Sequence, residues 1–323
     1  MEKKHVIVLA SPGFRGLEAL DPIRGEAHFH FVNTVEDAGP VIGQAEVIFA
    51  WDHARHGLLE VLWPSATSVR WVQSGSAGVE SVLFGELVES SVVLTNATGL
   101  YSDVLAEFVV ASILYFAQNL DQLRSLQMAR IWSRLEVLRP SSQTLGIVGR
   151  GDVGRAAAAL AHCLNMRLLG CRRNPEKADE GLPIERIYTP DSLLEMLPEC
   201  DYVLLCVPLT PETTRMFGKA QLEVMKPSSV LINIARGGVV QEEALIQALQ
   251  EGSIRGAALD VFEREPLPTA SPLWGMENVL LSPHSADYTF DLEASAGRLF
   301  VGNFRRYLKE EPLLNIVDKQ AGY

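Results

Sequence analysis

The sequence predicts an α/β protein of two domains, each built on a doubly wound parallel sheet. Three observations carry this prediction. The chain has 323 residues, enough for about two domains of roughly 150 residues each. Short β-rich apolar runs alternate with helical patterns along the whole chain. A glycine-rich turn joins one of these runs to a helix, as in sheets that bind dinucleotides.

The first set of apolar runs predicts a small sheet of parallel strands over residues 5–10, 46–51, 69–73 and 91–96. A long amphipathic helix is predicted from residue 101 to about 120, and a polar connection follows at residues 139–142. A second set then predicts six strands, at residues 144–149, 167–171, 202–208, 229–235, 257–262 and 278–282. Six strands interleaved with helices are what a doubly wound dinucleotide-binding sheet requires.

These runs divide the chain into a dinucleotide-binding Rossmann domain at residues 100–288 and a second domain at residues 1–99 and 289–323. We expect the second domain to be discontinuous and flavodoxin-like, and to bind the substrate. The reason is the predicted helix at residues 292–308, which follows the last strand of a sheet that is already complete.

Composition excludes several classes of protein. Hydrophobic residues make up 47% of the chain and charged residues 21%, as in globular proteins. The net charge is −12, from 28 Lys and Arg against 40 Asp and Glu, so we expect no nucleic-acid partner. The longest apolar stretch, residues 105–117, is too short to span a membrane. The four cysteines form no CxxC pair, which favours reduced thiols in the cytoplasm.

The glycine turn is the sequence GRGDVG, which follows the strand TLGIV and opens a helix. Gly149 permits a tight turn, Gly151 lets the backbone approach a pyrophosphate, and Gly154 allows close packing of the helix on the strand. The N–H groups at the start of this helix are donors for an anion. The turn, with Asp152 and Val153, therefore predicts a dinucleotide site.

The end of the second strand of this sheet indicates which dinucleotide binds. An acid there would bind the ribose hydroxyls of NAD, but this chain has Cys171 followed by Arg172 and Arg173. Guanidinium groups suit phosphate geometry, so we expect the 2′-phosphate of NADP(H) to be preferred, with NAD(H) possible. The alternative is that both arginines are solvated surface charges.

Three further strands end near a conspicuous polar residue, namely Arg236, Glu265 and His284. An arginine can clamp a substrate carboxylate through two parallel N–H bonds. A histidine whose second nitrogen bonds a carboxylate can move the proton that accompanies hydride transfer. Each residue alone has a structural explanation, but together they equip a site for reducing a 2-oxo acid.

Several stretches resemble the D-isomer-specific 2-hydroxyacid dehydrogenase family. The most specific is VLINIARGGVVQEEALIQALQEGSIRGAALDVFEREPLP, which NVLLSPH follows. VPLTPET, WVQSGSAGVESV, LTNATG and the glycine turn extend the resemblance over nearly the whole chain. The resemblance implies that Arg236 binds the substrate, that Glu265 is the acid paired with histidine, and that His284 donates the proton.

The resemblance also implies residues that bind the cofactor and the substrate carboxylate. Asp260 corresponds to the residue that holds the nicotinamide carboxamide, together with backbone near Ala235. Backbone N–H groups at Ala77 and Gly78 would bind the substrate carboxylate. The cofactor would be lined by Val207, Pro208 and Thr213.

Two departures from the family pattern bear on specificity. Cys171, in place of an acid, is similar to the NADP(H)-preferring glyoxylate and hydroxypyruvate reductases. Ser285 to Tyr288 replace the small glycine-rich run that is common after the histidine, so the identity of the 2-oxo acid stays open.

Other functions stay open as alternatives. They are a nucleotide-sensing corepressor or binding protein of the same fold, and a phosphoglycerate or phosphite dehydrogenase. Formate oxidation is disfavoured, because formate enzymes of this family carry glutamine where this chain has Glu265. We expect no metal site, since the cluster Asp52-His53-Ala54-Arg55-His56 lacks a third ligand at suitable spacing. We expect a homodimer built on residues 101–120, whose apolar side chains exceed what one sheet covers: Phe108, Val109, Ile113, Leu114 and Phe116.

Overall fold

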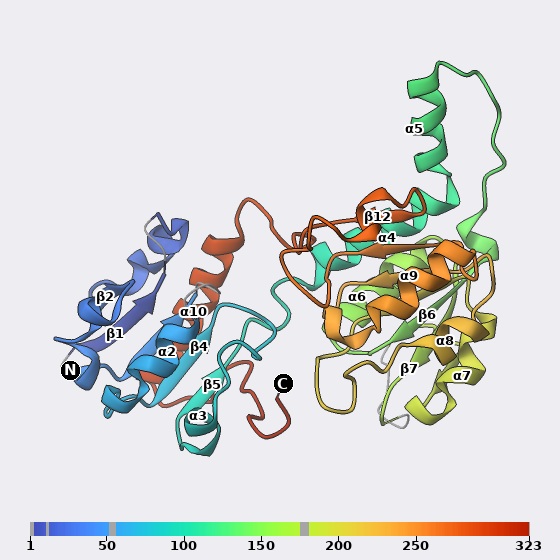
Figure 1. The fold of residues 1–323 in the computed structure, drawn as a ribbon. Coiled ribbons are helices and arrows are strands. Elements are labelled where there is room, and N and C mark those ends of the chain that lie inside the picture. The colour runs from blue at the N-terminus through green and yellow to red at the C-terminus, as the bar shows by residue number, and fades with distance from the viewer. Residues whose placement is uncertain (1–2, 11–12, 52–55, 175–180, 323) are drawn as a thin grey trace. The chain divides into compact units, whose positions relative to one another are not determined.

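The structure, a computed structural model, describes residues 3–10, 13–51, 56–174 and 181–322. The chain divides into two compact units, Met1–Tyr101 with Tyr288–Tyr323 and Ser102–Asp287 (Figure 1). Both units are α/β with a parallel sheet, as predicted. Their boundaries lie close to those expected for a substrate domain and a cofactor domain, and these roles stay predictions.

The first unit contains a five-stranded parallel sheet with strand order β2-β1-β3-β4-β5. The order reverses between β1 and β3, which is the flavodoxin-like arrangement. The sequence did not predict β2, whose residues AHFHFV alternate histidine with apolar side chains at the edge of the sheet. The strands are β1 Lys4–Leu9, β2 Ala27–Val32, β3 Val47–Ala50, β4 Trp71–Ser74 and β5 Val93–Thr95.

Helical segments cover both faces of this sheet. Strand side chains alternate between the two faces, and they are buried in two separate apolar clusters, one on each face. The C-terminal helix α10, Leu292–Leu308, has the predicted bounds and packs in the first unit. Its Phe300 stacks on Phe49 of β3 and Trp71 of β4, with ring centroids 4.7 and 5.3 Å apart. The remaining helical segments are η1 Arg15–Ile23, α1 Val35–Ala38, η2 Ile42–Gln44, α2 His56–Leu62, η4 Trp63–Ser65 and α3 Gly85–Glu89.

The second unit contains a seven-stranded parallel sheet with strand order β12-β11-β10-β9-β6-β7-β8. The order reverses between β6 and β9, so both halves of the sheet start beside β6, as in dinucleotide-binding sheets. The sequence predicted six of these strands and missed β8, which has only three residues. The strands are β6 Thr144–Val148, β7 Arg167–Cys171, β8 Arg186–Tyr188, β9 Tyr202–Leu205, β10 Val230–Asn233, β11 Gly256–Leu259 and β12 Val279–Leu281.

In this unit α4 (Ser102–Ala117) and α6 (Asp152–Cys163) pack on one face of the sheet, and their buried residues share one core. The shorter helices α7 (Leu193–Met196), α8 (Lys219–Val224) and α9 (Glu242–Glu251) pack on the other face. Short 3-10 turns complete the unit: η5 Pro140–Ser142, η6 Pro190–Ser192, η7 Leu197–Glu199, η8 Gly237–Val239 and η9 Pro272–Gly275.

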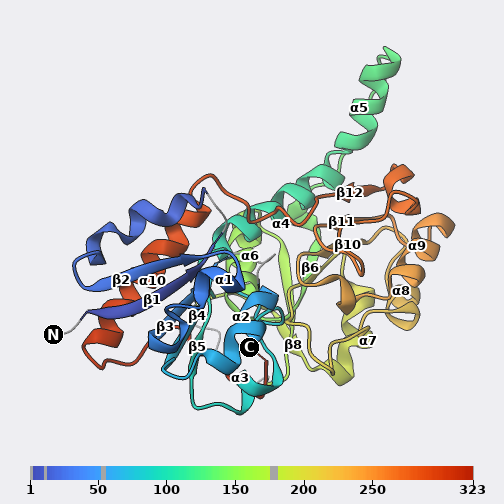
Figure 2. The ribbon, with the colours of Figure 1, turned by 60° about the vertical axis from the view of Figure 1, so that its left-hand side comes forward.

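The helix predicted for residues 101–120 ends earlier than expected. α4 stops at Ala117, and a separate helix α5, Leu120–Ala129, follows at 56° to it. Asn119, between them, has a left-handed φ of +51°, which interrupts the α-helical path. Figure 2 shows α5 projecting away from the rest of its unit. Within the described part of the chain, no single helix is long and apolar enough to cross a membrane.

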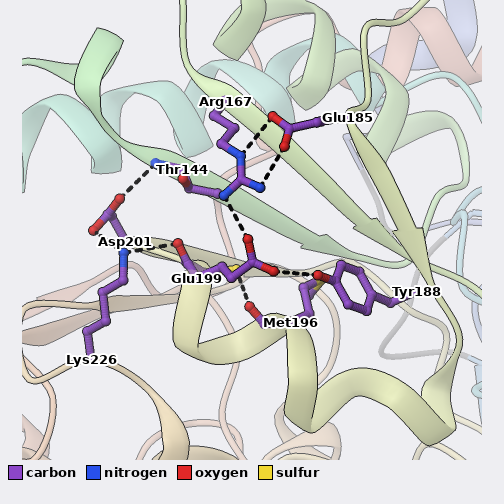
Figure 3. Close-up of polar contacts among 9 residues, drawn as sticks. Thr144, Arg167, Glu185, Tyr188, Met196, Glu199, Asp201 and Lys226 are labelled. Atoms are coloured by element: carbon purple, nitrogen blue, oxygen red, sulfur yellow. Dashed lines mark hydrogen bonds and ion pairs between the residues drawn. The ribbon is translucent and has the colours of Figure 1, made fainter.

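A polar network ties together the amino ends of the strands in the second unit (Figure 3). Arg167, the first residue of β7, donates two hydrogen bonds to Glu185, at 2.8 and 2.7 Å, and pairs with Glu199 at 2.8 Å. Lys226 pairs with Asp201 at 2.8 Å, and the other carboxylate oxygen of Asp201 accepts the N–H at the start of β6. The charges at this edge hold strands together, whereas the predicted site residues lie at the opposite, carboxyl edge.

Candidate active site

Three neighbouring strands position the predicted catalytic residues. β10, β11 and β12 are parallel and adjacent, so the segments that leave their carboxyl ends meet at one edge of the sheet. Arg236 follows β10, Glu265 lies in the segment after β11, and His284 follows β12. The structure brings Glu265 and His284 into direct contact, and the charge of Arg236 acts on both.

The contact between His284 and Glu265 fixes the imidazole ring. His284 Nδ1 lies 2.7 Å from Glu265 Oε2, while Glu265 Oε1 accepts the Phe262 N–H at 3.0 Å. Both oxygens of the carboxylate are therefore engaged, and the ring presents Nε2 on its other side. The His284 side chain is 44% exposed, which leaves it accessible to a substrate.

The electrostatics of the pair favour a charged imidazolium beside a charged carboxylate. The hydrogen bond to Glu265 raises the pKa of His284 above its ordinary value, with the Glu265 charge adding to it and burial and Arg236 opposing it. Burial acts to raise the pKa of Glu265, but the bonds from His284 and the Phe262 N–H and the Arg236 charge together lower it. A proton is therefore available on His284 near neutral pH.

Asp260 holds the turn that carries the histidine. Asp260 is 2% exposed, and one oxygen of its carboxylate accepts the N–H groups of Ser285 and Ala286 at 2.9 and 3.0 Å. Its backbone carbonyl accepts the N–H of His284 at 2.8 Å. These bonds fix a turn in which His284 has a left-handed φ of +51°. The sequence pointed to Asp260 only through the family resemblance and did not indicate this contact with the turn.

Asn233, which the sequence did not single out, shapes the turn before Arg236. It is buried at the end of β10, where its side chain accepts the Ala235 N–H at 3.1 Å and donates to the Arg236 carbonyl at 3.3 Å. Arg236 Nη1 donates to the Ala235 carbonyl at 2.7 Å. A Cβ at Gly237 would lie 1.8 Å from the Phe262 backbone, so the next residue must be glycine. The sequence feature that could have identified Asn233 is a polar residue at the end of a buried, apolar strand.

Two glycines of the glycine turn are closely packed against backbone, and the third faces open space. Gly149 has φ +102°, and a Cβ there would lie 2.6 Å from the Cys206 carbonyl oxygen. A Cβ at Gly154 would lie 2.3 Å from the Gly149 carbonyl oxygen. A Cβ at Gly151, the residue before α6, would meet no atom within 4 Å. Backbone at this position can therefore approach a pyrophosphate at the amino end of α6. Asp152, in the first turn of the helix, pairs with Arg155.

A cavity of about 210 Å³ lies beside this turn, at the carboxyl ends of β6 and β7. Six residues that the sequence assigned to the cofactor site line it: Gly149, Arg172, Arg173, Val207, Pro208 and Thr213. The Thr213 hydroxyl donates to the Pro208 carbonyl at 2.6 Å, which fixes the far wall. The sequence analysis did not assign six other lining residues to the cofactor site: Val148, Arg150, Pro190, Thr210, Glu212 and Met216. Apolar walls with basic groups at one end fit the adenosine half of a dinucleotide.

Ala77 and Gly78 lie in the first unit, in the loop after β4. Hydrogen bonds hold this loop: Asn96 Nδ2 donates to the Ala77 carbonyl at 2.8 Å, and the Tyr101 hydroxyl donates to the Gly75 carbonyl at 2.5 Å. Because they belong to the other unit, the role of Ala77 and Gly78 in holding a substrate against Arg236 stays a prediction.

Residues 52–55, which contain most of the cluster considered for a metal, lie outside the described residues. Among the residues that the structure describes, no group of three or more His, Cys, Asp or Glu is arranged to hold a metal ion.

Comparison with known proteins adds a family to this geometry. Residues 110–286 match the family described as "D-isomer specific 2-hydroxyacid dehydrogenase, NAD binding domain". The chain is 35% identical over 271 residues to the glyoxylate reductase of Thermococcus gammatolerans, covering 80% of this chain and 79% of the relative. It is 30% identical over 256 residues to the D-3-phosphoglycerate dehydrogenase of Methanocaldococcus jannaschii, covering 78% of this chain but only 48% of that relative.

One solved structure is similar over almost the full length of both chains. It is the NADPH-dependent glyoxylate/hydroxypyruvate reductase of Sinorhizobium meliloti in complex with NADP and sulfate. Its TM-score is 0.86 at 26% identity, over 99% of this chain and 100% of that one.

Proposed function

Because the chain belongs to the D-isomer-specific 2-hydroxyacid dehydrogenase family, we propose that it reduces a small 2-oxo acid to the D-2-hydroxy acid at the expense of NADPH. Glyoxylate, hydroxypyruvate or a larger 2-oxo acid is the substrate. The observation that carries this proposal is the 2.7 Å contact between His284 and Glu265 beside Arg236. The enzyme class follows from the family, whereas the substrate, the direction and the preferred cofactor belong to the proposal.

The three residues divide the handling of charge and protons. The nicotinamide cofactor, when bound, supplies the hydride that C2 of the substrate accepts. Arg236 binds the substrate carboxylate with its planar guanidinium, which suits a bidentate contact. His284 gives its Nε2 proton to the oxygen on C2 as negative charge develops there. Glu265 keeps the ring oriented and stabilises its charged form.

The cofactor would be held by the turn and the cavity. The backbone at Gly151 and the start of α6 would bind the pyrophosphate. Asp260 and the backbone near Ala235 would face the nicotinamide carboxamide, as the family resemblance implies. Arg172 and Arg173, which line the cavity, would bind the 2′-phosphate. The Sinorhizobium reductase, which was solved with NADP, supports this preference. NAD(H) stays a possible second cofactor.

We also propose a homodimer, but with an interface different from the one expected on α4. Val109, Ile113 and Phe116 of α4 are buried against the sheet of their own unit. Several large apolar side chains are instead exposed beyond α4, on α5 and on the segment that follows it, among them Leu120, Leu123, Met128, Ile131, Trp132 and Val137. A second copy of the chain is the partner that we propose for this arm.

A cytoplasmic location is proposed as well. All four cysteines are free thiols. Burial raises the pKa of Cys171 to about 11 and that of Cys200 to about 12, so these thiols are unreactive in a reducing compartment.

A steady-state panel tests the proposed activity. Glyoxylate, hydroxypyruvate, pyruvate and phenylpyruvate are each offered with NADPH and with NADH, and 3-phosphoglycerate and phosphite are offered with NAD. We expect at least one 2-oxo acid to be reduced, with higher kcat/KM for NADPH than for NADH. Turnover of phosphoglycerate or phosphite alone would support one of the alternative dehydrogenases. Cofactor binding without turnover of any substrate would support a nucleotide-sensing binding protein.

A further inference from the structure

Arg150 is a buried cation inside the cofactor turn. It lies between Gly149 and Gly151 in the glycine turn, and only 8% of its surface is exposed. Its side chain crosses Gly170 of β7: a Cβ at Gly170 would lie 2.8 Å from Arg150 Cδ and 3.6 Å from Nη1. The absence of a side chain at Gly170 therefore makes room for the stem of Arg150.

Arg150 and Arg172 converge because the two strands that carry them are neighbours. β6 and β7 pair in parallel, and their last residues, Val148 and Cys171, lie opposite each other. Arg150 and Arg172 therefore follow the carboxyl ends of two neighbouring strands. Together with Arg173 they place three guanidinium groups on one cavity of about 210 Å³. One carboxylate, Glu212, also lines this cavity and interacts with the charge of Arg173. In a chain with a net charge of −12, the cavity therefore has a local excess of positive charge.

The surroundings of Arg150 disfavour the charged form of its guanidinium group. Burial, together with the like charges of Arg172 and Arg155, lowers the pKa of Arg150 to about 10. An anion that accepts hydrogen bonds from both guanidinium groups offsets the repulsion between their like charges.

A phosphate monoester fits this site better than a phosphodiester. It carries nearly two negative charges near neutral pH and three acceptor oxygens, which two guanidinium groups can contact from two sides. The end of the second strand of such a sheet is also where the adenosine ribose is read.

We infer that Arg150 is a cofactor-binding residue that contacts the 2′-phosphate of NADP(H) together with Arg172 and sets the selectivity for NADPH over NADH. This inference rests on the proposed function and extends it to a residue within the glycine turn. Arg173 is exposed and Arg172 is half-buried, so water and salt screen their charges more than that of Arg150. Arg150 therefore contributes more selectivity than Arg173, especially at high salt.

The test compares Arg150→Met with the wild type. Methionine keeps an unbranched stem over Gly170 and removes the charge. We expect the Kd for NADPH to rise by roughly 10- to 100-fold, the equivalent of one charge-assisted contact, and the Kd for NADH to stay within about twofold. Arg155→Met is the matched control, because it removes a neighbouring arginine that does not line the cavity, and it should leave the ratio of the two Kd values unchanged.

A second variant guards against a loss of folding in Arg150→Met. Gly170→Ala places a methyl group against Arg150 Cδ and should displace the side chain, so it should lower the NADPH selectivity while Arg150 is present. In an Arg150→Ala background the same Gly170→Ala change should leave the selectivity unaltered. Equal effects of Gly170→Ala in both backgrounds would contradict the inference.

Calorimetry with adenosine 2′,5′-bisphosphate and adenosine 5′-monophosphate separates this inference from the proposed function, because it needs no turnover. If the wild type binds both nucleotides equally, the proposed NADPH preference itself fails. If the wild type prefers the bisphosphate and Arg150→Met keeps that preference in full, only the role of Arg150 is wrong. We expect the preference in the wild type and its loss, by at least about tenfold, in the variant.

Discussion

His284 lies 2.7 Å from one carboxylate oxygen of Glu265, and in our account it is the proton donor. Replacing His284 by alanine removes the donor and leaves the glycine turn and the cavity intact. We expect kcat for 2-oxo acid reduction to fall by about 10²- to 10⁴-fold, the range for loss of a general acid. The Kd for NADPH, measured by titration of protein fluorescence, should stay unchanged. Turnover near that of the wild type would show that the proton comes from another group.

The pH dependence of the reaction should report the His284–Glu265 contact. Because this bond raises the pKa of His284, the acid form persists above the ordinary value, and reduction should slow only as pH rises through the raised pKa. Glu265→Gln removes the negative charge that favours the imidazolium. The basic limb of the kcat/KM profile should therefore move to lower pH in this variant. A limb that stays at the same pH would mean that His284 is not the titrating group.

Arg236→Lys tests the bidentate contact with the substrate carboxylate. Lysine keeps the charge and loses the planar fork. We expect kcat/KM to fall by roughly 10- to 200-fold, equivalent to about 1.5–3 kcal/mol for a charge-assisted hydrogen bond. The comparison is made with saturating NADPH, so that only substrate binding and the chemical step contribute. An unchanged kcat/KM would exclude Arg236 from the site.

At the residue scale, the sequence identified the side chains that follow strand ends but not the bonds that position them. Arg236, Glu265 and His284 could be predicted as site residues, because the strands that precede them are clear apolar runs in the sequence. The contacts of Asp260 depend on a turn with a left-handed φ at His284, which no sequence pattern specifies. The path of Arg150 over Gly170 depends on how β6 pairs with β7, so its burial was not predictable.

The turn between β6 and α6 allows a matched comparison of two glycines. Gly154→Ala brings a Cβ to 2.3 Å from the Gly149 carbonyl oxygen, so α6 must shift. We expect it to lower the free energy of unfolding by about 1–3 kcal/mol, as overpacking does. Gly151→Ala meets no atom within 4 Å and should change stability by less than about 0.5 kcal/mol, yet it should weaken the binding of NADPH and NADH equally. Chemical denaturation and cofactor titration measure both effects, and equal stability losses would contradict the division of roles.

The sequence patterns did not predict two of the strands or the break between α4 and α5. β2 and β8 lie at sheet edges, where solvent-facing side chains dilute the apolar signal. The break between α4 and α5 occurs at Asn119, near the end of the predicted helix, and the sequence analysis did not predict α5 beyond it. By contrast, α10 was predicted over its full length, because its apolar positions recur at helical spacing and a core covers them.

At the scale of the whole molecule, the apolar arm predicts self-association. Leu120→Glu changes a residue of α5 that is 44% exposed, and Leu194→Glu changes a residue of α7 that is also 44% exposed. We expect the wild type and Leu194→Glu to sediment as dimers at micromolar concentration and Leu120→Glu to shift toward the monomer. Leu120 belongs to a run of exposed apolar side chains, whereas the other apolar side chains of α7, Leu193 and Met196, are buried. A monomeric wild type would refute the proposed dimer.

The division of the chain into two units was predictable because the C-terminal helix follows a sheet that is already complete. Sequence patterns carry no comparable information on how the substrate, expected near Ala77 and Gly78, meets Arg236. The central claim of the proposed function is that hydride is transferred from the cofactor to C2 of a 2-oxo acid.

Isotope transfer tests this claim most directly. The protein is incubated with hydroxypyruvate or glyoxylate and NADPH that carries deuterium at C4 of the nicotinamide, in the position that is transferred, and the product is analysed by mass spectrometry and chiral chromatography. We predict a 2-hydroxy acid with one deuterium at C2, of D configuration where C2 is chiral. Consumption of NADPH without deuterium at C2 of the product, or no product from any 2-oxo acid tested, would contradict the account.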